Sequence, residues 1–446
     1  MSSLTTSPEP QGRPVLGFLP RGASFWLLAV VLGLLVFASS APSPLYGVYQ
    51  QKWQFSATTL TAIFGVYALA LIVTLLVVGA LSDYVGRRPV IVGALVVEIG
   101  AMALFLAATG VGWLYGARVL QGCAVGAATS ALSAALIDLQ PPGSTRAPVV
   151  NSFTPGFGLA LGALVTSLLV QYAPAPTHLI WWLLLGGFAL AIPAVLAVPE
   201  SVARHPGALR SLRPRLGVPR PCLGAFVAGL PGMVALWALG GFYLSLGPSL
   251  AGSIMGSRNL TWGGVMIVLL TGVGSLSSLL FRNSVPAAAV LWGAVALLAG
   301  VGVTVGGIEA PSAALLLVGT AVAGVGFGVA FLGSFRILSA LAPPTERARL
   351  VATIYVVCYL SFSLPAIAAG VAVTHSNLHD ASLGYAAFVG GLSAIAVASA
   401  LARRSSHERT AGRVGMHKLP PTPCAAPMTE IPAIDRRAAA ASSSSS

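Results

Sequence analysis

Charged residues are scarce in this chain: of 446 residues, only 8% are Asp, Glu, Lys or Arg. Soluble domains carry roughly a quarter charged residues, so the composition excludes a water-soluble fold. Hydrophobic residues make up 56% of the chain, and its mean hydropathy is +0.87. What the sequence has in excess is therefore apolar surface, which a membrane can cover.

Acidic residues and cysteines are scarcer still, at 11 and 4 residues. The formal net charge is +13, but the basic residues lie in short loops and form no patch interleaved with aromatic residues, so we expect no nucleic-acid partner. The cysteines have no paired spacing, and we expect them to be chemically inert; they are Cys123, Cys222, Cys358 and Cys424.

The chain lacks a phosphate-binding loop of the Walker type, a His/Glu metal cluster and a nucleophile elbow. We therefore expect no enzymatic activity, no catalytic residue, no bound metal and no cofactor. The stretch up to about Gly22 contains several prolines and no apolar region followed by a cleavage site of small residues, so we expect no signal peptide and interpret the first apolar segment as a retained helix.

Long apolar runs recur along the chain, and each has about 20 residues, enough to cross a hydrocarbon core of roughly 30 Å as an α-helix. They predict an all-α integral membrane protein with twelve transmembrane helices. The predicted helices span residues 24–46, 57–79, 88–109, 112–138, 148–171, 178–198, 222–248, 262–281, 286–306, 311–340, 349–374 and 382–402.

The longest break between predicted helices, residues 199–221, is rich in arginine and proline. It predicts a linker between two six-helix bundles, residues 24–198 and 222–402, with disordered ends at 1–23 and 403–446. Nearly all loop arginines fall on the side of the N-terminus and of this linker. The positive-inside rule then predicts that both termini are cytoplasmic, in a multi-pass protein of the cell (inner or plasma) membrane.

The two predicted bundles resemble each other in sequence. Three collinear stretches match: Ser39, Pro42 and Ser43 correspond to Ser245, Pro248 and Ser249; the loop from Gly79 corresponds to the loop from Gly274; Gly122 and Gly126 correspond to Gly324 and Gly328. Repeated bundles of this kind place a substrate path near the middle of the membrane, between the halves. The repeat therefore predicts pseudo-symmetric bundles around such a path.

The loop between the second and third predicted helices carries the most specific motif. Its key positions are Gly79, Asp83, Gly86, Arg87 and Arg88. This loop resembles the signature loop of the major facilitator superfamily. The resemblance implies a gating loop, in which Asp83 docks on the N-terminal end of the eleventh helix, where Arg349 would receive it. The alternative is that Asp83 only neutralises the neighbouring arginines.

In the fourth predicted helix, Arg118, Gln121, Gly122 and Gly126 share one face. The stretch resembles the fourth-helix motif of the same family, whose arginine is implicated in proton coupling. Glu98 is the only acid well inside an apolar segment, so it is the expected partner of Arg118 and a candidate proton carrier. The alternative is an ion pair that only locks two helices together.

The fifth predicted helix contains Gly158 and Gly162, and it resembles part of a motif of the bacterial drug–proton antiporters of this family. The match is incomplete, because Ala163 stands in place of a proline and Thr166 and Ser167 stand in place of two glycines. Small residues four apart are also common where helices pack closely. Together with Gly122 and Gly126, these glycines are therefore interpreted as a helix-packing motif.

Neutral polar and aromatic residues of the first, fourth and seventh helices are candidates for a substrate cavity. They are Ser39, Ser43, Tyr46, Tyr49, Gln121, Trp237, Tyr243 and Ser249. The aromatic ones could equally be anchors at the membrane surface. Because little charge is available at depth, a neutral or amphipathic ligand fits better than a strongly ionic one.

The resemblance extends over residues 24–402 and implies a secondary transporter with two six-helix bundles. We expect proton-coupled export of small amphipathic or drug-like molecules, driven by the proton gradient. The expected partners are a small-molecule substrate, protons and the lipid bilayer, and we expect a monomer. Two alternatives stay open: an importer or uniporter of a neutral nutrient, and a facilitator-like sensor or assembly partner that does not transport.

Overall fold

The computed structural model describes residues 18–214, 216–343 and 346–416, and within these residues every regular element is a helix. Twelve helical spans are long and apolar enough to cross a membrane, which confirms the predicted all-α membrane fold. The first six spans comprise α1 (Arg21–Ser40) with α2 (Pro42–Trp53), α3 (Ala57–Val78), α5 (Arg87–Leu106), α6 (Val111–Leu139), α7 (Arg146–Tyr172) and α8 (Leu179–Leu196).

The last six spans comprise α10 (Arg220–Ser245), α12 (Thr261–Ile267) with η1 (Val268–Gly272) and α13 (Val273–Leu280), α14 (Pro286–Glu309), α15 (Ala313–Leu341), α16 (Arg347–His375) and α17 (Leu378–Met416). Three shorter helices lie between or after them: α4 (Ser82–Val85), α9 (Ala208–Ser211) and α11 (Gly247–Met255). The predicted linker thus contains the helical turn α9.

Proline interrupts the first helix of each bundle. α1 gives way to α2 at Pro42, and α10 gives way to α11 just before Pro248. Proline removes a helical N–H and clashes with the preceding turn, but it is tolerated in the first turn of the next segment. For that reason the first span does not end near residue 46, as predicted, but continues through α2 to Trp53.

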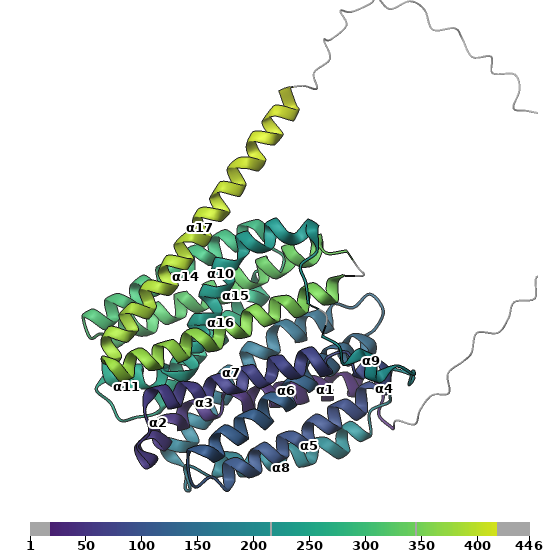
Figure 1. The fold of residues 1–446 in the computed structure, drawn as a ribbon, viewed down its shortest axis with the longest axis vertical. Helices are drawn as coiled ribbons and strands as arrows, with labels where there is room; N and C mark the ends of the chain where they lie inside the picture. The colour runs from purple at the N-terminus through teal and green to yellow at the C-terminus, as the bar shows by residue number, and fades with distance from the viewer. Residues whose placement is uncertain (1–17, 215, 344–345, 417–446) are drawn as a thin grey trace, which may run out of the picture. The chain divides into compact units, whose positions relative to one another are not determined.

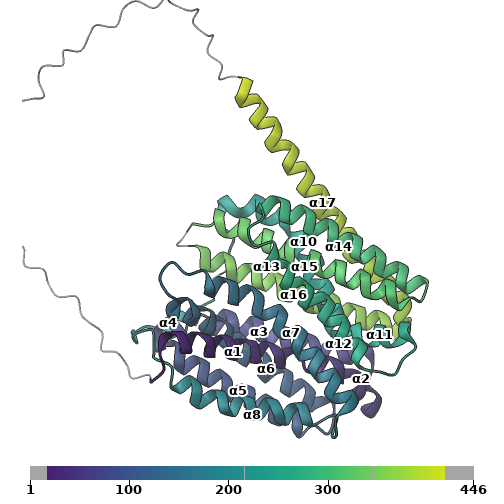
Figure 2. The same cartoon turned by 180° about the vertical axis from the view of Figure 1, so that it is seen from behind.

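The two bundles meet along two pairs of helices. α3 packs against α16, and α7 packs against α12, η1 and α13. Figures 1 and 2 show α7 and α16 in the middle of the chain's helices, with α5 and α8 on the far side of the first bundle and α14 on the far side of the second. Thr58 and Thr374 join α3 to α16 through their hydroxyl oxygens, 2.9 Å apart.

Glycine allows α14 and α15 to pack closely. Gly293, Gly300 and Gly307 recur at every seventh residue of α14, and a Cβ atom at each would collide with the backbone of α15. Gly319, Gly326 and Gly333 do the same on α15 against α14. Without a water-driven hydrophobic effect between membrane helices, such close backbone contact is a main source of stability.

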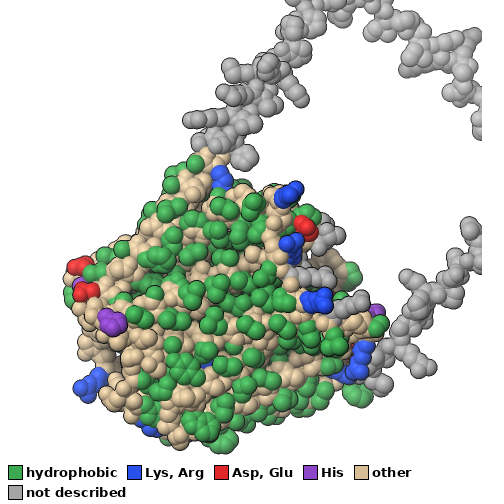
Figure 3. All heavy atoms as spheres, viewed as in Figure 1, with side chains coloured by type: hydrophobic (Ala, Val, Ile, Leu, Met, Phe, Trp, Pro, Cys, Tyr) green, Lys and Arg blue, Asp and Glu red, His purple; other side chains and the backbone are tan. Residues whose placement is uncertain are grey.

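Side chains are distributed as a membrane protein requires. Figure 3 shows hydrophobic side chains over the middle of one face, with Lys and Arg side chains gathered at the end that carries α4 and α9 in Figure 1. We call this the basic end. It carries the loops that begin or end α3, α5, α8 and α10, and the sequence predicts it to be cytoplasmic.

The chain through Leu401 forms one compact unit, and the residues from Ala402 form a second. The twelfth helix was expected to end at residue 402, whereas α17 continues to Met416. No proline occurs between Arg403 and Met416, so no residue of this stretch forces the helix to end. The rest of the two predicted disordered ends, residues 1–17 and 417–446, lies outside the described residues.

Candidate functional site

Glu98, on α5, and Arg118, on α6, are both enclosed, with 0% and 1% of their surface exposed. No ion pair joins them within the part of the chain that the structure describes. Instead, Gln121 lies between them: its Oε1 accepts from Arg118 Nη1 at 2.5 Å, and its Nε2 donates to Glu98 Oε1 at 3.2 Å. The expectation of a direct pair is therefore wrong, because the amide on the same helix face as Arg118 fills the space between the two charges.

The proline kink of the first helix explains the position of Gln121. Because Pro42 has no N–H, the carbonyl of Ala38 loses its usual donor. Gln121 Nε2 donates to Ala38 O at 3.0 Å, and Arg118 Nη1 donates to Ser39 O at 3.0 Å. The kink of the first helix is thus held by side chains of α6, and one amide connects it to the buried carboxyl group of α5.

Three polar atoms of this cluster are buried without a hydrogen-bond partner among the described residues: Glu98 Oε2, Arg118 Nε and Tyr46 Oη. Leaving a buried polar group unpaired costs about 1–3 kcal/mol, so such atoms mark places where water or a proton can bind. The carboxyl group of Glu98 has one oxygen in a hydrogen bond and one free. It can therefore take up and release a proton at Oε2 without breaking the link to Gln121.

Aromatic rings of α3 cover the guanidinium group of Arg118. Its Cζ lies 4.0 Å from the ring centre of Tyr67 and 5.9 Å from that of Phe64. A cation over an aromatic face is stabilised by about 0.5–2 kcal/mol. Neutral hydrogen-bond acceptors and aromatic faces, rather than an acid, therefore surround this charge.

The predicted packing glycines all lie at close approaches between helices. A Cβ atom at Gly122 or Gly126 would meet the backbone of α3. One at Gly158 would lie 3.1 Å from Gly33 O of α1, and one at Gly162 would collide with the same helix. The glycines of α6 thus bring α6 close to α3, and those of α7 bring α7 close to α1.

At the basic end, Asp83 and Arg87 form an ion pair within the predicted gating loop. Arg87 also lies beside Asp138 at the end of α6, with Nε 3.3 Å from Oδ2, and its Nη1 donates to Ser82 Oγ at 2.8 Å. The side chain of Asp83 is 56% exposed. In this structure Asp83 therefore neutralises a neighbouring arginine, as the alternative interpretation of the loop expected.

Glu200, which follows α8, caps the N-terminus of α5. Its Oε1 accepts from Arg87 N at 2.8 Å and its Oε2 accepts from Arg88 N at 3.0 Å. A carboxylate in this position satisfies free helical N–H groups and interacts favourably with the helix dipole. Gly86 is required beneath it, because its φ is +101° and a Cβ atom would lie 2.7 Å from Glu200 Oε2.

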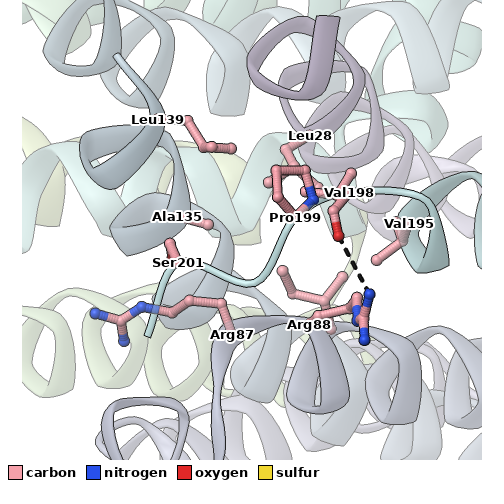
Figure 4. Close-up of a pocket in the computed structure, with 10 residues that line it drawn as sticks. Leu28, Arg87, Arg88, Ala135, Leu139, Val195, Val198, Pro199 and Ser201 are labelled. Atoms are coloured by element: carbon pink, nitrogen blue, oxygen red, sulfur yellow. Dashed lines mark hydrogen bonds between the residues drawn. The ribbon is translucent and has the colours of Figure 1, made fainter. Parts of the chain in front are cut away.

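Arg88 ties the end of α8 to α5. Its Nη1 donates to the carbonyl oxygens of Leu196 at 3.0 Å and Val198 at 3.3 Å. Figure 4 shows the side chains of Arg87 and Arg88 pointing away from each other on either side of the segment that carries Pro199. The cavity beside them has a volume of about 10 Å³, which leaves room for about one water molecule and not for a substrate.

Arg349, at the start of α16, does not contact Asp83 in this structure. Its Nε donates to the carbonyl oxygen of Leu216 at 2.6 Å, and Gly217, with φ of +154°, lies directly against the guanidinium group. Gly217 N also donates to Thr353 Oγ1 at 2.9 Å. The linker therefore occupies the place where the resemblance had put Asp83.

The candidate cavity residues of the first bundle are largely enclosed. Ser39, Ser43, Tyr46 and Tyr49 are each at most 5% exposed. Tyr49 accepts a hydrogen bond from Trp181 Nε1 at 3.0 Å and stacks on a neighbouring ring, so it packs inside the bundle rather than along a path. Ser39 joins the cluster around Arg118 through its backbone carbonyl, and Tyr46 joins it through its Oη, which is unpaired among the described residues.

The candidates of the second bundle differ in their surroundings. Trp237 is partly exposed and lies within 5.4–6.3 Å, centre to centre, of four other rings, and its buried Nε1 has no acceptor among the described residues. Tyr243 is buried, with its hydroxyl group 3.0 Å from that of Thr320. Ser249 is partly exposed on α11. Of these residues, Trp237 is the one whose surroundings suit a ligand.

Sequence reasoning missed two residues that matter here. Glu200 is not among the site residues expected from the sequence, although an acid just after one helix and a glycine just before another were both visible signals. Tyr67 gave no signal, because a tyrosine in an apolar helix looks like any other packing residue. Its role depends on the arginine of another helix.

Comparisons with known proteins agree with this architecture. The family profile described as Major Facilitator Superfamily matches residues 28–284. A search of curated proteins finds no match. Among solved structures, a bacterial homolog of the human lysosomal transporter Spinster, in an inward-facing and unoccupied conformation, is 12% identical with a TM-score of 0.69, and the alignment covers 85% of this chain and 97% of that one.

Two further solved structures are similar over the same helices. The nucleoside transporter NupG is 13% identical with a TM-score of 0.62, covering 84% of this chain and 98% of that chain. The human organic anion transporter MFSD10 is 16% identical with a TM-score of 0.62, covering 85% of this chain and 100% of that chain. At these identities the likeness concerns the fold, and the three proteins differ in what their names say they carry.

Proposed function

Because the chain belongs to the major facilitator superfamily, and is thus a membrane transporter of small molecules, we propose that it exports small amphipathic molecules in exchange for protons. The proton gradient would be the driving force, and no cofactor would take part. The protein would work as a monomer in the cell membrane, with both termini in the cytoplasm. Substrate would pass between the two bundles as they rock about their shared interface.

One observation carries the proposal of proton coupling: the buried carboxyl group of Glu98 has a free oxygen and is linked through Gln121 to the kinked first helix. Acids inside a membrane bundle are costly and usually serve ion or proton pathways. In this proposal a proton binds at Glu98 Oε2 from outside and leaves to the cytoplasm, and the substrate moves in the opposite direction.

The link to the first helix supplies the coupling step. While Glu98 is ionised, Gln121 Nε2 is drawn toward a full negative charge; when Glu98 is protonated, that attraction weakens and the amide is held mainly by Ala38 O. A change of this size, of order 1 kcal/mol, is large enough to shift a balance between two conformations of similar free energy. Protonation would thereby alter how firmly the kink is held.

The gating loop would act at the basic end. In the state described here Arg349 is bound by Leu216 O and Asp83 by Arg87. We propose that the two residues meet when the cytoplasmic side closes, after Arg349 leaves the linker. The exposed carboxylate of Asp83 is free to make this exchange, because it is held only by a partner within its own loop.

Substrate-dependent proton movement in inverted membrane vesicles tests the proposed function. Vesicles containing the protein are energised, and a pH-sensitive dye follows the lumen while a panel of amphipathic aromatic amines and neutral amides is added. A proton-coupled exporter is expected to release protons from the lumen when a substrate is added. Uptake of labelled compound without any proton signal would favour the uniporter, and neither signal across the panel would favour a protein that does not transport.

A further inference from the structure

The rings of Phe64 and Tyr67 stand between the buried charge of Arg118 and the second bundle. On one side the ring of Tyr67 lies 4.0 Å from the guanidinium carbon. On the other side the ring of Phe64 lies 4.9 Å from that of Phe362 on α16, centre to centre, across the interface of the two bundles. A single layer of rings thus separates the cation from the neighbouring bundle.

The second bundle presents rings to this layer as well. Phe362 packs against Trp237 of α10 and against Tyr359 of α16, with ring centres 5.9 Å and 6.3 Å apart. Trp237 and Tyr359 are partly exposed, whereas Arg118 is 1% exposed. A ligand between the bundles would therefore meet aromatic faces on both sides and would not reach the guanidinium group.

The free hydrogen-bonding groups of this region indicate what else the ligand carries. Trp237 Nε1 is buried without an acceptor within the described residues. An indole N–H that is removed from water normally has an acceptor, so a state in which an oxygen or nitrogen acceptor binds there is favoured. A planar ring with a neutral acceptor, such as an amide carbonyl, fits both the rings and the donor.

We propose that Tyr67 sets the charge selectivity of the transporter: by covering Arg118, it makes the path between the bundles select planar, neutral aromatic molecules and reject carboxylates. If the cover is removed, the guanidinium group becomes available to a carboxylate, for which it is the best-matched side chain in proteins. Tyr67 is then a specificity-determining residue that acts by hiding a charge. This inference rests on the proposed function only in placing the ligand between the bundles.

The test compares two ligands that differ in charge but not in shape, naphthalene-2-carboxamide and naphthalene-2-carboxylate. Isothermal titration of the full chain in nanodiscs gives the ratio of their Kd values. We expect the wild-type protein to bind the amide at least about ten-fold more tightly than the carboxylate. Tyr67→Ala is expected to reduce this preference by about ten-fold or more. A ten-fold change in the ratio of Kd values corresponds to about 1.4 kcal/mol.

Control variants separate the cover from simple packing. Tyr67→Phe keeps the aromatic face and is expected to keep the wild-type ratio. Tyr67→Leu keeps much of the buried volume but removes the aromatic face, so it is expected to shift the ratio of Kd values in the same direction as Tyr67→Ala. It serves as the test if Tyr67→Ala folds poorly. The shift is expected to disappear when Arg118→Gln is added, since the carboxylate then has no cation to reach.

An unchanged ratio in Tyr67→Leu would overturn the inference. So would a wild-type protein that binds the carboxylate as tightly as the amide, or that binds neither compound. Because the titration uses no gradient and no vesicle, its outcome is independent of proton coupling. A proton-coupled transporter with no preference for the amide would therefore refute this inference and leave the proposed function intact.

Discussion

The two bundles kink their first helices at matching prolines, Pro42 and Pro248, but they bury different groups beside the kink. In the first bundle Gln121 donates to the carbonyl of Ala38, which lacks its usual donor because position 42 is a proline. In the second bundle the repeat position of Gln121 is Ala323, which has no donor, and its neighbour on α14 is Gly300 in place of an acid. The charged network beside the first kink therefore has no counterpart at these positions of the second bundle.

The basic end has the same asymmetry. The loop of the first bundle contains an ion pair and a carboxylate cap on α5, whereas the matching loop of the second bundle is held by Arg336, whose Nη1 donates to the carbonyl oxygens of Arg282 and Ser284. Among the described residues, the only fully buried acid, Glu98, lies in the first bundle. The difference between the bundles is therefore a buried, hydrogen-bonded carboxyl group in the first and partly exposed aromatic rings such as Trp237 in the second.

The largest effect is expected from Glu98→Gln. This change removes the only carboxyl group that is fully buried among the described residues, while the amide can still accept from Gln121. Proton-driven export in inverted vesicles is expected to fall to the level of empty vesicles, with the protein still folded by size-exclusion chromatography. A control in the second bundle, Thr320→Val, removes a hydroxyl group that lies 3.0 Å from that of Tyr243 and donates to Leu316 O, and it is expected to leave coupling in place. Equal losses of proton-driven export in Glu98→Gln and Thr320→Val would contradict the proposed difference between the bundles.

A second prediction concerns the amide that links the charges. Gln121→Leu leaves Glu98, Arg118 and the carbonyl of Ala38 without their partner, so the free energy of unfolding is expected to fall by about 3 kcal/mol. The loss would be measured as a lower midpoint of unfolding in detergent. Thr320→Val in the second bundle is expected to cost about 1 kcal/mol. If Gln121→Leu lowered the free energy of unfolding by no more than Thr320→Val does, the hydrogen bonds of Gln121 would not stabilise the kink.

A third prediction tests close packing in the second bundle. Gly300→Ala places a methyl group against the backbone of Ala323, so we expect a loss of about 1–3 kcal/mol in unfolding free energy. Gly302 lies on the same helix, and a Cβ atom added there would have no other atom within 4 Å. Gly302→Ala is therefore expected to be neutral or slightly stabilising. Similar midpoints for the two variants would argue against glycine-mediated contact between α14 and α15.

A fourth prediction concerns the cap of α5. Glu200→Gln weakens the charge at two backbone N–H groups, and we expect a loss of about 1 kcal/mol in stability together with faster hydrogen exchange at the start of α5. The exchange should stay unchanged at the start of α14, which has no such cap. Unchanged hydrogen exchange at the backbone amides of Arg87 and Arg88 would show that Glu200 does not stabilise the start of α5.

The smallest effect is expected from the gating loop. Asp83→Asn is expected to slow transport several-fold, and Ser278→Asn, at the matching position of the second bundle, to have no effect. The reason is that an aspartate near a helix N-terminus contributes only about 0.3–1 kcal/mol, which matters for a conformational balance and not for folding. Crosslinking between cysteines at the basic ends of α3 and α16 would report the shift. Identical behaviour of the two variants would reduce Asp83 to a local partner of Arg87.

Much of the fold could be predicted because hydrophobic length is a strong signal in a membrane protein. The twelve spans, the linker near residues 199–221 and the proline in each first helix all follow from the sequence. The end of the first span was misplaced because a proline that kinks a helix looks like one that ends it. The tail of α17 was misplaced because composition alone does not distinguish a charged helix from an irregular segment.

The site could be predicted only in part. Spacing along α6 placed Arg118 and Gln121 on one face, but it could not reveal that the amide would stand between Arg118 and the acid of α5. The contact of Glu200 with α5 joins residues 113 positions apart, which no local pattern encodes. Arg349 lies at the start of the eleventh helix as predicted, but it is bound by the linker, whose path has no periodic signal, rather than by Asp83.

The central claim is that Glu98 changes its protonation when a ligand binds between the bundles. Infrared difference spectroscopy measures this directly, since a protonated carboxyl group and a carboxylate absorb at different frequencies. When naphthalene-2-carboxamide is added to wild-type protein in lipid, we expect a carboxyl band to appear or disappear, and we expect that band to be absent in Glu98→Gln and present in Thr320→Val. The same band in Glu98→Gln, or no carboxyl band in wild-type protein that demonstrably binds the ligand, would contradict the account.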